Sequence, residues 1–243
     1  MRSIAKSTQP QTVTSLQCAT TTNLTSNASA RAAFNQLDKR VVRSTLAAEQ
    51  GHLCAFCMRA INHAAMDANG QYTTPIAHRV PIDVDPSLAL TWSNLLACCD
   101  GGRVARADVK TCDFAQGSAA LTVDPTRATS VRQLRFERGD PTVPESPGAS
   151  KESAEGLYLR SENESLRADV ETLGLNRGDL PALRAQALKA FQHLLRRAHP
   201  PSTWTGATKP TFLTRWKAQH APKLPPYVGV VEAWVAGQQM RCQ

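Results

Sequence analysis

The stretch LAAEQGHLCAFCMRAI (46–61) carries the pattern on which the fold depends. It places Cys54 and Cys57 in a C-x2-C pair directly after a helical pattern. Two residues between the cysteines let both sulfurs turn toward one ion. Zinc takes four ligands in a tetrahedron and favours thiolates. The pair therefore predicts one half of a zinc site.

The second half of that site must come from Cys98, Cys99 and Cys112. We predict that Cys99 and Cys112 are the ligands, with the inserted loop GGRVARADVKT (101–111) between them, and that Cys98 faces the neighbouring core. The alternative is a buried thiol cluster without metal. We favour zinc because a small region with few aromatic residues lacks the core to fold alone, and a metal supplies that stability.

Composition sets broad limits on the class of protein. The chain has 243 residues, enough for one large domain or two small ones, and 42% of them are hydrophobic. No apolar run reaches the roughly 18 residues that cross a bilayer, and the N-terminus lacks the apolar core of a secretory signal. We therefore expect a cytoplasmic protein without a membrane partner. In that reducing compartment, five of the seven cysteines clustered between 54 and 112 indicate metal rather than disulfides.

The charge balance points to a polyanionic partner. The formal net charge is +8 and the isoelectric point is about 9.4. Lys and Arg side chains that neutralise phosphates release condensed counterions, which favours binding to nucleic acid. The same surplus is also compatible with a modestly positive, solvated surface.

We expect an α+β fold that is mainly helical. Residues 1–50 are predicted to form an N-terminal arm (1–30, rich in Ser, Thr, Asn and Gln) and a lead-in helix (31–50) that ends at Gly51. Residues 51–138 are predicted to form the zinc-bound core, 139–156 a linker or surface loop, and 157–243 a helical C-terminal region. The elements expected within these regions are a hairpin over 72–83, short helices over 94–96 and from 113, a strand over 129–137, and helices over 165–173, 180–197 and 226–238.

Three polar residues lie between and beside the cysteines in a fixed order. His78 is at the centre of IAHRVP (76–81), Asn94 is in WSNLL (92–96), and Asp113 directly follows Cys112. Taken singly, each residue has an ordinary structural explanation. A strand histidine usually packs or faces solvent, an asparagine often caps a turn, and an aspartate often begins a helix. Only the ordered set indicates a function.

This order of motifs resembles the HNH nuclease family. In that family a β-hairpin and a helix clasp one divalent ion, the ββα-metal or His-Me finger core, and zinc often staples the motif. The opening EQ-x-x-LC-x-x-C (49–57), W-x-NLL-x-x-C (92–99) and CD-x-x-x-G (112–117) are similar to the PtuB-like HNH effectors of Septu and retron-type anti-phage defence systems. The LTVDP segment (121–125) and the helical C-terminal part are similar too, so the resemblance covers most of the chain.

The resemblance implies an activity, roles for residues, and partners. The activity would be metal-dependent hydrolysis of phosphodiester bonds in DNA or RNA. His78 would be the general base, Asn94 would hold the loop that carries it, and Asp113 would bind Mg²⁺ or Mn²⁺. Members of the group work beside an ABC-type ATPase, and in retrons also beside a reverse transcriptase with its DNA product.

Two positions depart from the family pattern. Ala77 stands where the family has an acidic metal ligand before the histidine, and Gln116 stands where it has a lysine. Asp83 or Asp85 could compensate for the missing carboxylate. These departures leave an alternative open: a catalytically inactive, zinc-stabilised module that binds nucleic acid or assembles with partners. A homing or restriction-type enzyme acting alone is less favoured, because no separate specificity domain is evident.

Overall fold

The computed structural model describes the chain except for residues 21–23, 69, 71, 104–107, 140–155 and 238–243. The described part is α+β and mainly helical, as predicted, with two small antiparallel sheets. Its helices are α1 (Gln11–Thr20), α2 (Asn27–Gln36), α3 (Lys39–Glu49), α4 (Cys112–Gln116), α5 (Ala128–Val131), α6 (Glu164–Thr172), α7 (Leu180–Ala198), α8 (Thr208–His220) and α9 (Val228–Val235). Its strands are β1 (Ile76–His78), β2 (Leu95–Ala97), β3 (Arg135–Arg138) and β4 (Leu157–Arg160).

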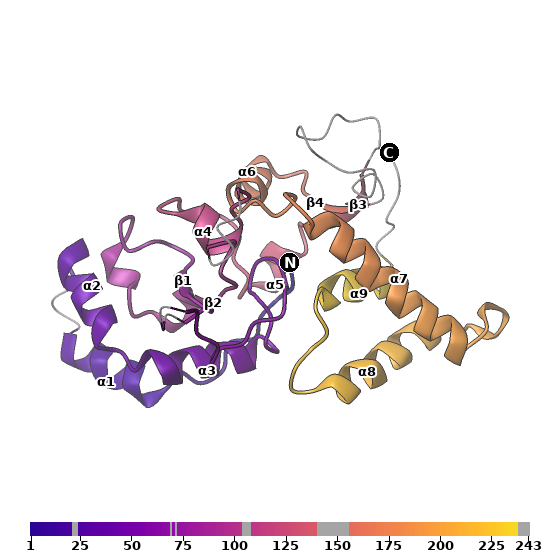
Figure 1. Cartoon of the computed structure of the whole chain (residues 1–243), viewed down its shortest axis with the longest axis horizontal. Coiled ribbons are helices and arrows are strands. Elements are labelled where there is room, and N and C mark those ends of the chain that lie inside the picture. The colour runs from indigo at the N-terminus through magenta and orange to yellow at the C-terminus, as the bar shows by residue number, and fades with distance from the viewer. Residues whose placement is uncertain (21–23, 69, 71, 104–107, 140–155, 238–243) are drawn as a thin grey trace.

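The elements fall into two groups in space. Helices α1 to α3 lie around β1 and β2 on one side of the molecule, and α7, α8 and α9 lie on the other (Figure 1). One continuous hydrophobic core includes residues from both groups, from Val42 in α3 to Leu188 in α7. No helix of the described residues is long and apolar enough to cross a membrane.

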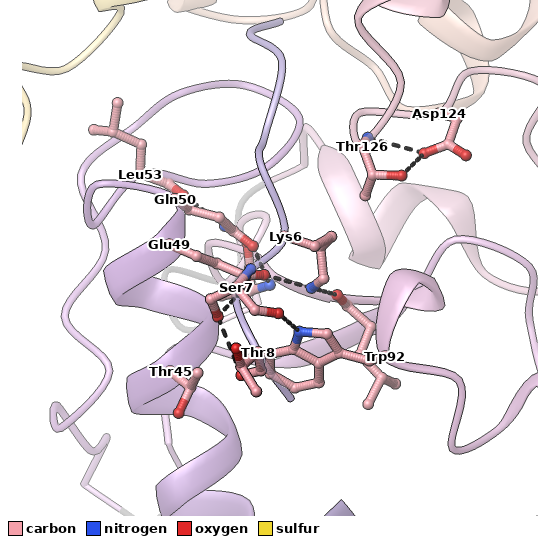
Figure 2. Close-up of polar contacts among 12 residues, drawn as sticks. Lys6, Ser7, Thr8, Thr45, Glu49, Gln50, Leu53, Trp92, Asp124 and Thr126 are labelled. Atoms are coloured by element: carbon pink, nitrogen blue, oxygen red, sulfur yellow. Dashed lines mark hydrogen bonds and ion pairs between the residues drawn. The ribbon is translucent and has the colours of Figure 1, made fainter. Parts of the chain in front are cut away.

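Much of the predicted N-terminal arm is helical, although its composition is typical of a loop. It forms α1 and α2, and Ile4 and Val13 are buried in the core. Figure 2 shows how the arm is fastened: Lys6 pairs with Glu49, and the Trp92 indole donates to the Ser7 carbonyl oxygen at 3.0 Å. A few well-placed apolar side chains and polar anchors therefore order a segment whose overall composition is that of a loop.

The single helix predicted over 31–50 is two helices. Leu37 has extended backbone angles, and the Asp38 carboxylate accepts hydrogen bonds from the amides of Arg40 and Val41 at 3.1 and 3.2 Å. Asp38 is thus an N-cap that begins α3. The predicted end of the helix is correct, because Gly51 follows α3 with a positive φ of 67°.

The predicted hairpin over 72–83 and the predicted helix over 94–96 were both wrong. Strand β1 pairs with the distant β2 in antiparallel register, His78 opposite Leu95 and Ile76 opposite Ala97. A 3₁₀ turn at Trp92–Asn94 leads into β2. All three residues of β2 are buried, and a short buried apolar run does not distinguish strand from helix by its pattern.

The second sheet joins the predicted core to the C-terminal region. Strand β3 pairs with β4, with Phe136 opposite Leu159, so residues on either side of the predicted linker form one sheet. The predicted strand over 129–137 is in fact α5 followed by β3. The predicted loop at 139–156 lies almost wholly outside the described residues. Helices α6 and α7 match their predictions, α9 is shorter than 226–238, and α8 was not predicted.

Candidate metal centre and neighbouring polar site

Four buried cysteines converge on one point in the core. The sulfurs of Cys54, Cys57, Cys99 and Cys112 all lie within 4.8 Å of one another. Cys54 and Cys112 are 3.7 Å apart, Cys57 and Cys99 3.7 Å, and Cys99 and Cys112 3.6 Å. A tetrahedral zinc ion with Zn–S bonds of about 2.3 Å separates its sulfurs by about 3.8 Å. The cluster could therefore hold a zinc ion, and its geometry fits one.

The electrostatics of the cluster also suit a cation. The pKa of Cys112 is well above its ordinary value, because its thiol hydrogen-bonds to Cys54, Cys57 and Cys99 and because it is buried. Four thiolates cannot crowd together in the core without a positive charge, and a divalent cation would supply it. Cys98 is buried beside the cluster but is not part of the group, and burial raises its thiol pKa. Of the other cysteines, Cys18 is exposed and Cys242 lies outside the described residues.

A buried amide ties this cysteine cluster to the first sheet. The Gln50 side chain donates to the carbonyl oxygens of Leu53 and Ala97 at 2.8 and 2.7 Å. Its own oxygen accepts the Ala97 amide at 2.9 Å. Gln50 is only 2% exposed, so these contacts are made away from water. The C-x2-C turn and β2 are thereby held in one register.

His78 ends β1 with its ring fixed from two sides. Its Nε2 lies 3.0 Å from the Ala89 carbonyl oxygen, and the ring packs edge-on against Phe34 at 4.6 Å. A carbonyl oxygen only accepts, so in the neutral ring Nε2 carries the proton and Nδ1 the lone pair. Burial lowers the His78 pKa below its ordinary value, and Arg31 and Lys39 lower it further. Burial and these two charges therefore favour the neutral imidazole, although the hydrogen bond to Ala89 opposes them.

Asn94 closes the loop that follows β1. Its side-chain oxygen accepts the Val80 amide at 2.8 Å, and its nitrogen donates to the carbonyl oxygens of Val80 and Leu88 at 3.0 and 3.1 Å. The side chain is buried, with 3% exposure for the residue. These bonds fix the main chain at Val80 and at Leu88, and Leu88 directly precedes Ala89, whose carbonyl oxygen contacts the His78 ring.

Asp113 lies in the first turn of α4 and already has a cationic partner. Arg103 donates to its carboxylate at 3.0 Å. Burial raises the Asp113 pKa, although the charge and hydrogen bond of Arg103 oppose that rise. Among the described residues, only the four cysteines form a group of three or more side chains placed to share a metal. In the described part of the chain, Asp113 therefore belongs to no such group.

The positions named as possible compensation for Ala77 have other partners. Ala77 is 1% exposed and lies in the core. Asp83 pairs with Arg31 at 2.6 Å and accepts from Ser118, which follows the C-terminal end of α4. Asp85 accepts hydrogen bonds from the amide and hydroxyl of Ser87. In this structure neither carboxylate is engaged at the Asp113 end of α4.

Gln116 has a positioning role that sequence reasoning missed. Its Nε2 lies 3.1 Å from the His78 carbonyl oxygen, 3.0 Å from that of Arg79 and 3.1 Å from that of Ala119. The residue is 4% exposed. From the sequence alone, this position was only a departure from the lysine of the resembled family. No local pattern identifies a glutamine as a clamp on a strand distant in sequence.

A cavity of about 430 Å³ lies beside these residues. Its lining includes Phe34, which contacts the His78 ring, and Arg103, which pairs with Asp113. Lys39 and Arg43 also line it, together with Asp67, Tyr72 and Asp100. Neither His78 nor Asp113 lines the cavity itself, and its lining combines three cations with two carboxylates.

No protein-family model matches the chain, and no curated protein matches its sequence.

Proposed function

We propose that the chain is a zinc-stapled, metal-dependent endonuclease of the HNH type, which hydrolyses phosphodiester bonds in nucleic acid. The observation that supports this most directly is the composition of α4. Its first residue, Cys112, belongs to the cysteine cluster, its second is Asp113, and its fifth, Gln116, grips the main chain of His78. One short helix thus connects the cysteine cluster, the candidate metal ligand Asp113 and the strand that carries His78. The antiparallel β1–β2 pair with α4 is our candidate for the ββα-metal core.

His78 is suited to the role of general base. A phosphodiester resists attack because its anionic oxygens repel a nucleophile, so a base must deprotonate water near the phosphorus. The Ala89 carbonyl holds the His78 ring with Nε2 protonated, which leaves Nδ1 to take the proton from water. Asn94 and Gln116 act as positioning residues, because both bind main-chain atoms rather than substrate.

Charge neutralisation is the other requirement of the reaction. Mg²⁺ or Mn²⁺ bound at Asp113 would offset the charge that develops on the phosphate and leaving oxygen. Lys39, Arg43 and Arg103 line the adjacent cavity and would bind the flanking phosphates. Arg103 would then exchange its contact with Asp113 for one with the substrate.

The biological setting follows only from the resemblance. We propose that the chain is the effector of a cytoplasmic anti-phage system of the Septu or retron type. It would act with an ABC-type ATPase, and in a retron also with a reverse transcriptase and its DNA product. A cluster of reduced thiols is consistent with a reducing compartment.

The deciding experiment is cleavage by the purified chain. Single- and double-stranded DNA and RNA are incubated with Mg²⁺ or Mn²⁺, with and without an ATPase encoded beside the gene. We expect metal-dependent cleavage that His78→Ala abolishes while zinc content and folding are retained. Equal cleavage by the wild type and His78→Ala would refute the assignment of the base.

A second function is favoured by two specific observations. Ala77 offers no metal ligand, and the Asp113 carboxylate is already paired with Arg103. Both fit a zinc-stabilised module that binds nucleic acid or assembles with partners but has no activity. This module would bind nucleic acid in a salt-sensitive way, cleave nothing under any metal condition, and behave identically after His78→Ala.

A further inference from the structure

The net positive charge of the chain arises at its C-terminal end. Residues 180–243 contain nine Lys and Arg residues against one acidic residue, Glu232, whereas residues 1–179 contain nineteen of each. Glu232 is already paired with Arg2 and Lys217. The net charge of +8 therefore arises in the part of the chain that forms α7, α8 and α9.

Helix α8 borders a groove in this basic region. The cavity measures about 520 Å³ and is lined by Thr208, Thr211, Phe212, Arg215, Trp216 and Gln219, which recur at helical spacing along one face of α8. The end of α7 contributes His199. None of the lining residues is acidic. No residue of α8 is fully buried: Phe212 and Trp216 pack against a small core formed by α7 and α9, and part of each ring stays exposed.

The aromatic side chains of the groove are held rigidly from behind. Phe191 of α7 is fully buried and packs edge-on against Phe212 at 5.5 Å and against Trp216 at 4.9 Å. Phe212 and Trp216 are themselves half-buried, and both line the groove. Fixed, partly exposed aromatic rings are platforms on which unpaired bases can stack.

Cations are available beside these rings. Arg215 lines the groove and lies between Phe212 and Trp216 in the sequence. Arg196 and Arg197 are exposed at the end of α7. None of these three arginines has an acidic partner among the described residues. A duplex hides its bases from such a surface, whereas a single strand offers both an unstacked base and a phosphate.

We infer that the α8 groove is a binding site for single-stranded nucleic acid. A base would stack on the Trp216 and Phe212 rings, Arg215 would bind an adjacent phosphate, and the threonine hydroxyls would accept or donate hydrogen bonds. This inference concerns binding alone. It goes beyond the proposed nuclease activity and stands even if the chain cleaves nothing.

The test uses the full chain carrying His78→Ala, without added Mg²⁺ or Mn²⁺, so that cleavage does not interfere. Binding of fluorescent thymidine and uridine homopolymers, and of a duplex of equal length, is measured by fluorescence anisotropy at several salt concentrations. We expect either single strand to bind more tightly than the duplex, with affinity falling as salt rises. The preferred homopolymer then tells whether the strand is DNA or RNA.

Three substitutions and one control locate the site. Arg215→Glu and Trp216→Leu should each weaken single-strand binding roughly ten-fold, whereas Trp216→Phe should retain most of it. Arg132→Glu, on an exposed arginine near α5, is the matched charge control and should change affinity less than about two-fold. Circular dichroism melting verifies folding of each variant, and Arg215 is exposed, so its replacement should leave the fold intact.

Three results would overturn the inference. They are undiminished binding by both Arg215→Glu and Trp216→Leu, equal affinity for the duplex and the single strands, and no binding of any nucleic acid. Failure of cleavage by the wild-type chain bears on the proposed nuclease and leaves this binding result unaffected.

Discussion

The side-chain nitrogen of Gln116 donates a hydrogen bond to the main-chain carbonyl oxygen of His78 across 3.1 Å. The same nitrogen lies 3.0 Å from the Arg79 carbonyl oxygen. Helix α4 therefore contacts the main chain at His78, the last residue of β1, and at Arg79 directly after it. The candidate base and the candidate metal ligand Asp113 are thereby fixed to the same helix. Disturbing this contact should affect catalysis through the position of the histidine.

We expect Gln116→Glu to lower the rate of cleavage by one to two orders of magnitude. A carboxylate would face several carbonyl oxygens without a proton to donate, at a cost of about 2 kcal/mol in the free energy of unfolding. Denaturant unfolding and the cleavage rate measure the two effects. Gln133→Glu, on the surface, is the control and should change neither. A Gln116→Glu protein with wild-type rate would show that this clamp does not position the base.

Replacing single cysteines should distinguish the zinc ligands from Cys98, which lies outside the group of four. Cys54→Ser and Cys112→Ser should lose zinc and melt at a much lower temperature, because metal binding in such sites is part of the folding free energy. Cys98→Ala should keep one zinc ion per chain, since Cys98 lies outside the group of four. Metal content by atomic emission spectroscopy checks this. Loss of zinc on replacing Cys98, with zinc retained on replacing Cys112, would contradict the ligand assignment.

The pH dependence of cleavage should reflect the lowered pKa of His78. Burial, Arg31 and Lys39 favour the neutral ring, so the acidic limb of the pH–rate profile should lie below the ordinary histidine value of 6.5. Arg31→Gln removes one of these charges and should move that limb to higher pH. An unmoved limb would mean that another group controls the rate.

The free energy of unfolding should also depend on the protonation of His78. Because the folded-state pKa of His78 is lower than its unfolded value, protonation favours the unfolded chain. The contribution of His78 to stability is therefore complete above pH 6.5 and is lost as pH falls through the folded-state pKa. Denaturant midpoints of the wild type and of His78→Phe, measured across this range, should converge at acidic pH. If the midpoints of the two proteins instead change in parallel with pH, His78 is not the group that causes the pH dependence of stability.

The parts of the site that could be predicted from sequence are those with a local or chemical signature. The spacing of Cys54 and Cys57 specifies a metal knuckle, and the choice of Cys99 over Cys98 agrees with the group that the structure assembles. Asn94 hydrogen-bonds to main-chain atoms of the loop after β1, and its role in catalysis stays a prediction. Each of these inferences depends on residue type and order, which are visible in a linear chain.

The missed features depend on contacts distant in sequence. The partner of β1 is 19 residues away, and the burial that orders Ile4 and Val13 comes from segments that no nearby pattern reveals. Gln116 looks like an ordinary helix residue until α4 is docked on β1. Helix α8 was not predicted because its sequence lacks the apolar stripe that identifies an amphipathic helix, and in the structure none of its residues is buried.

Ala77 provides the sharpest test of whether a catalytic metal belongs beside β1. Ala77→Asp restores the acidic residue that the HNH pattern has at this position, but places it where the native side chain is 1% exposed. Without a divalent ion, we expect the buried carboxylate to lower the free energy of unfolding by about 3 kcal/mol. Mn²⁺ should recover most of that loss in the variant and raise its cleavage rate above the wild-type rate. Ala77→Asn keeps the size without the charge and should respond less to Mn²⁺. If Mn²⁺ changes neither the stability nor the activity of Ala77→Asp, no cation binds between this strand and Asp113, and the inactive binding module becomes the better description of the chain.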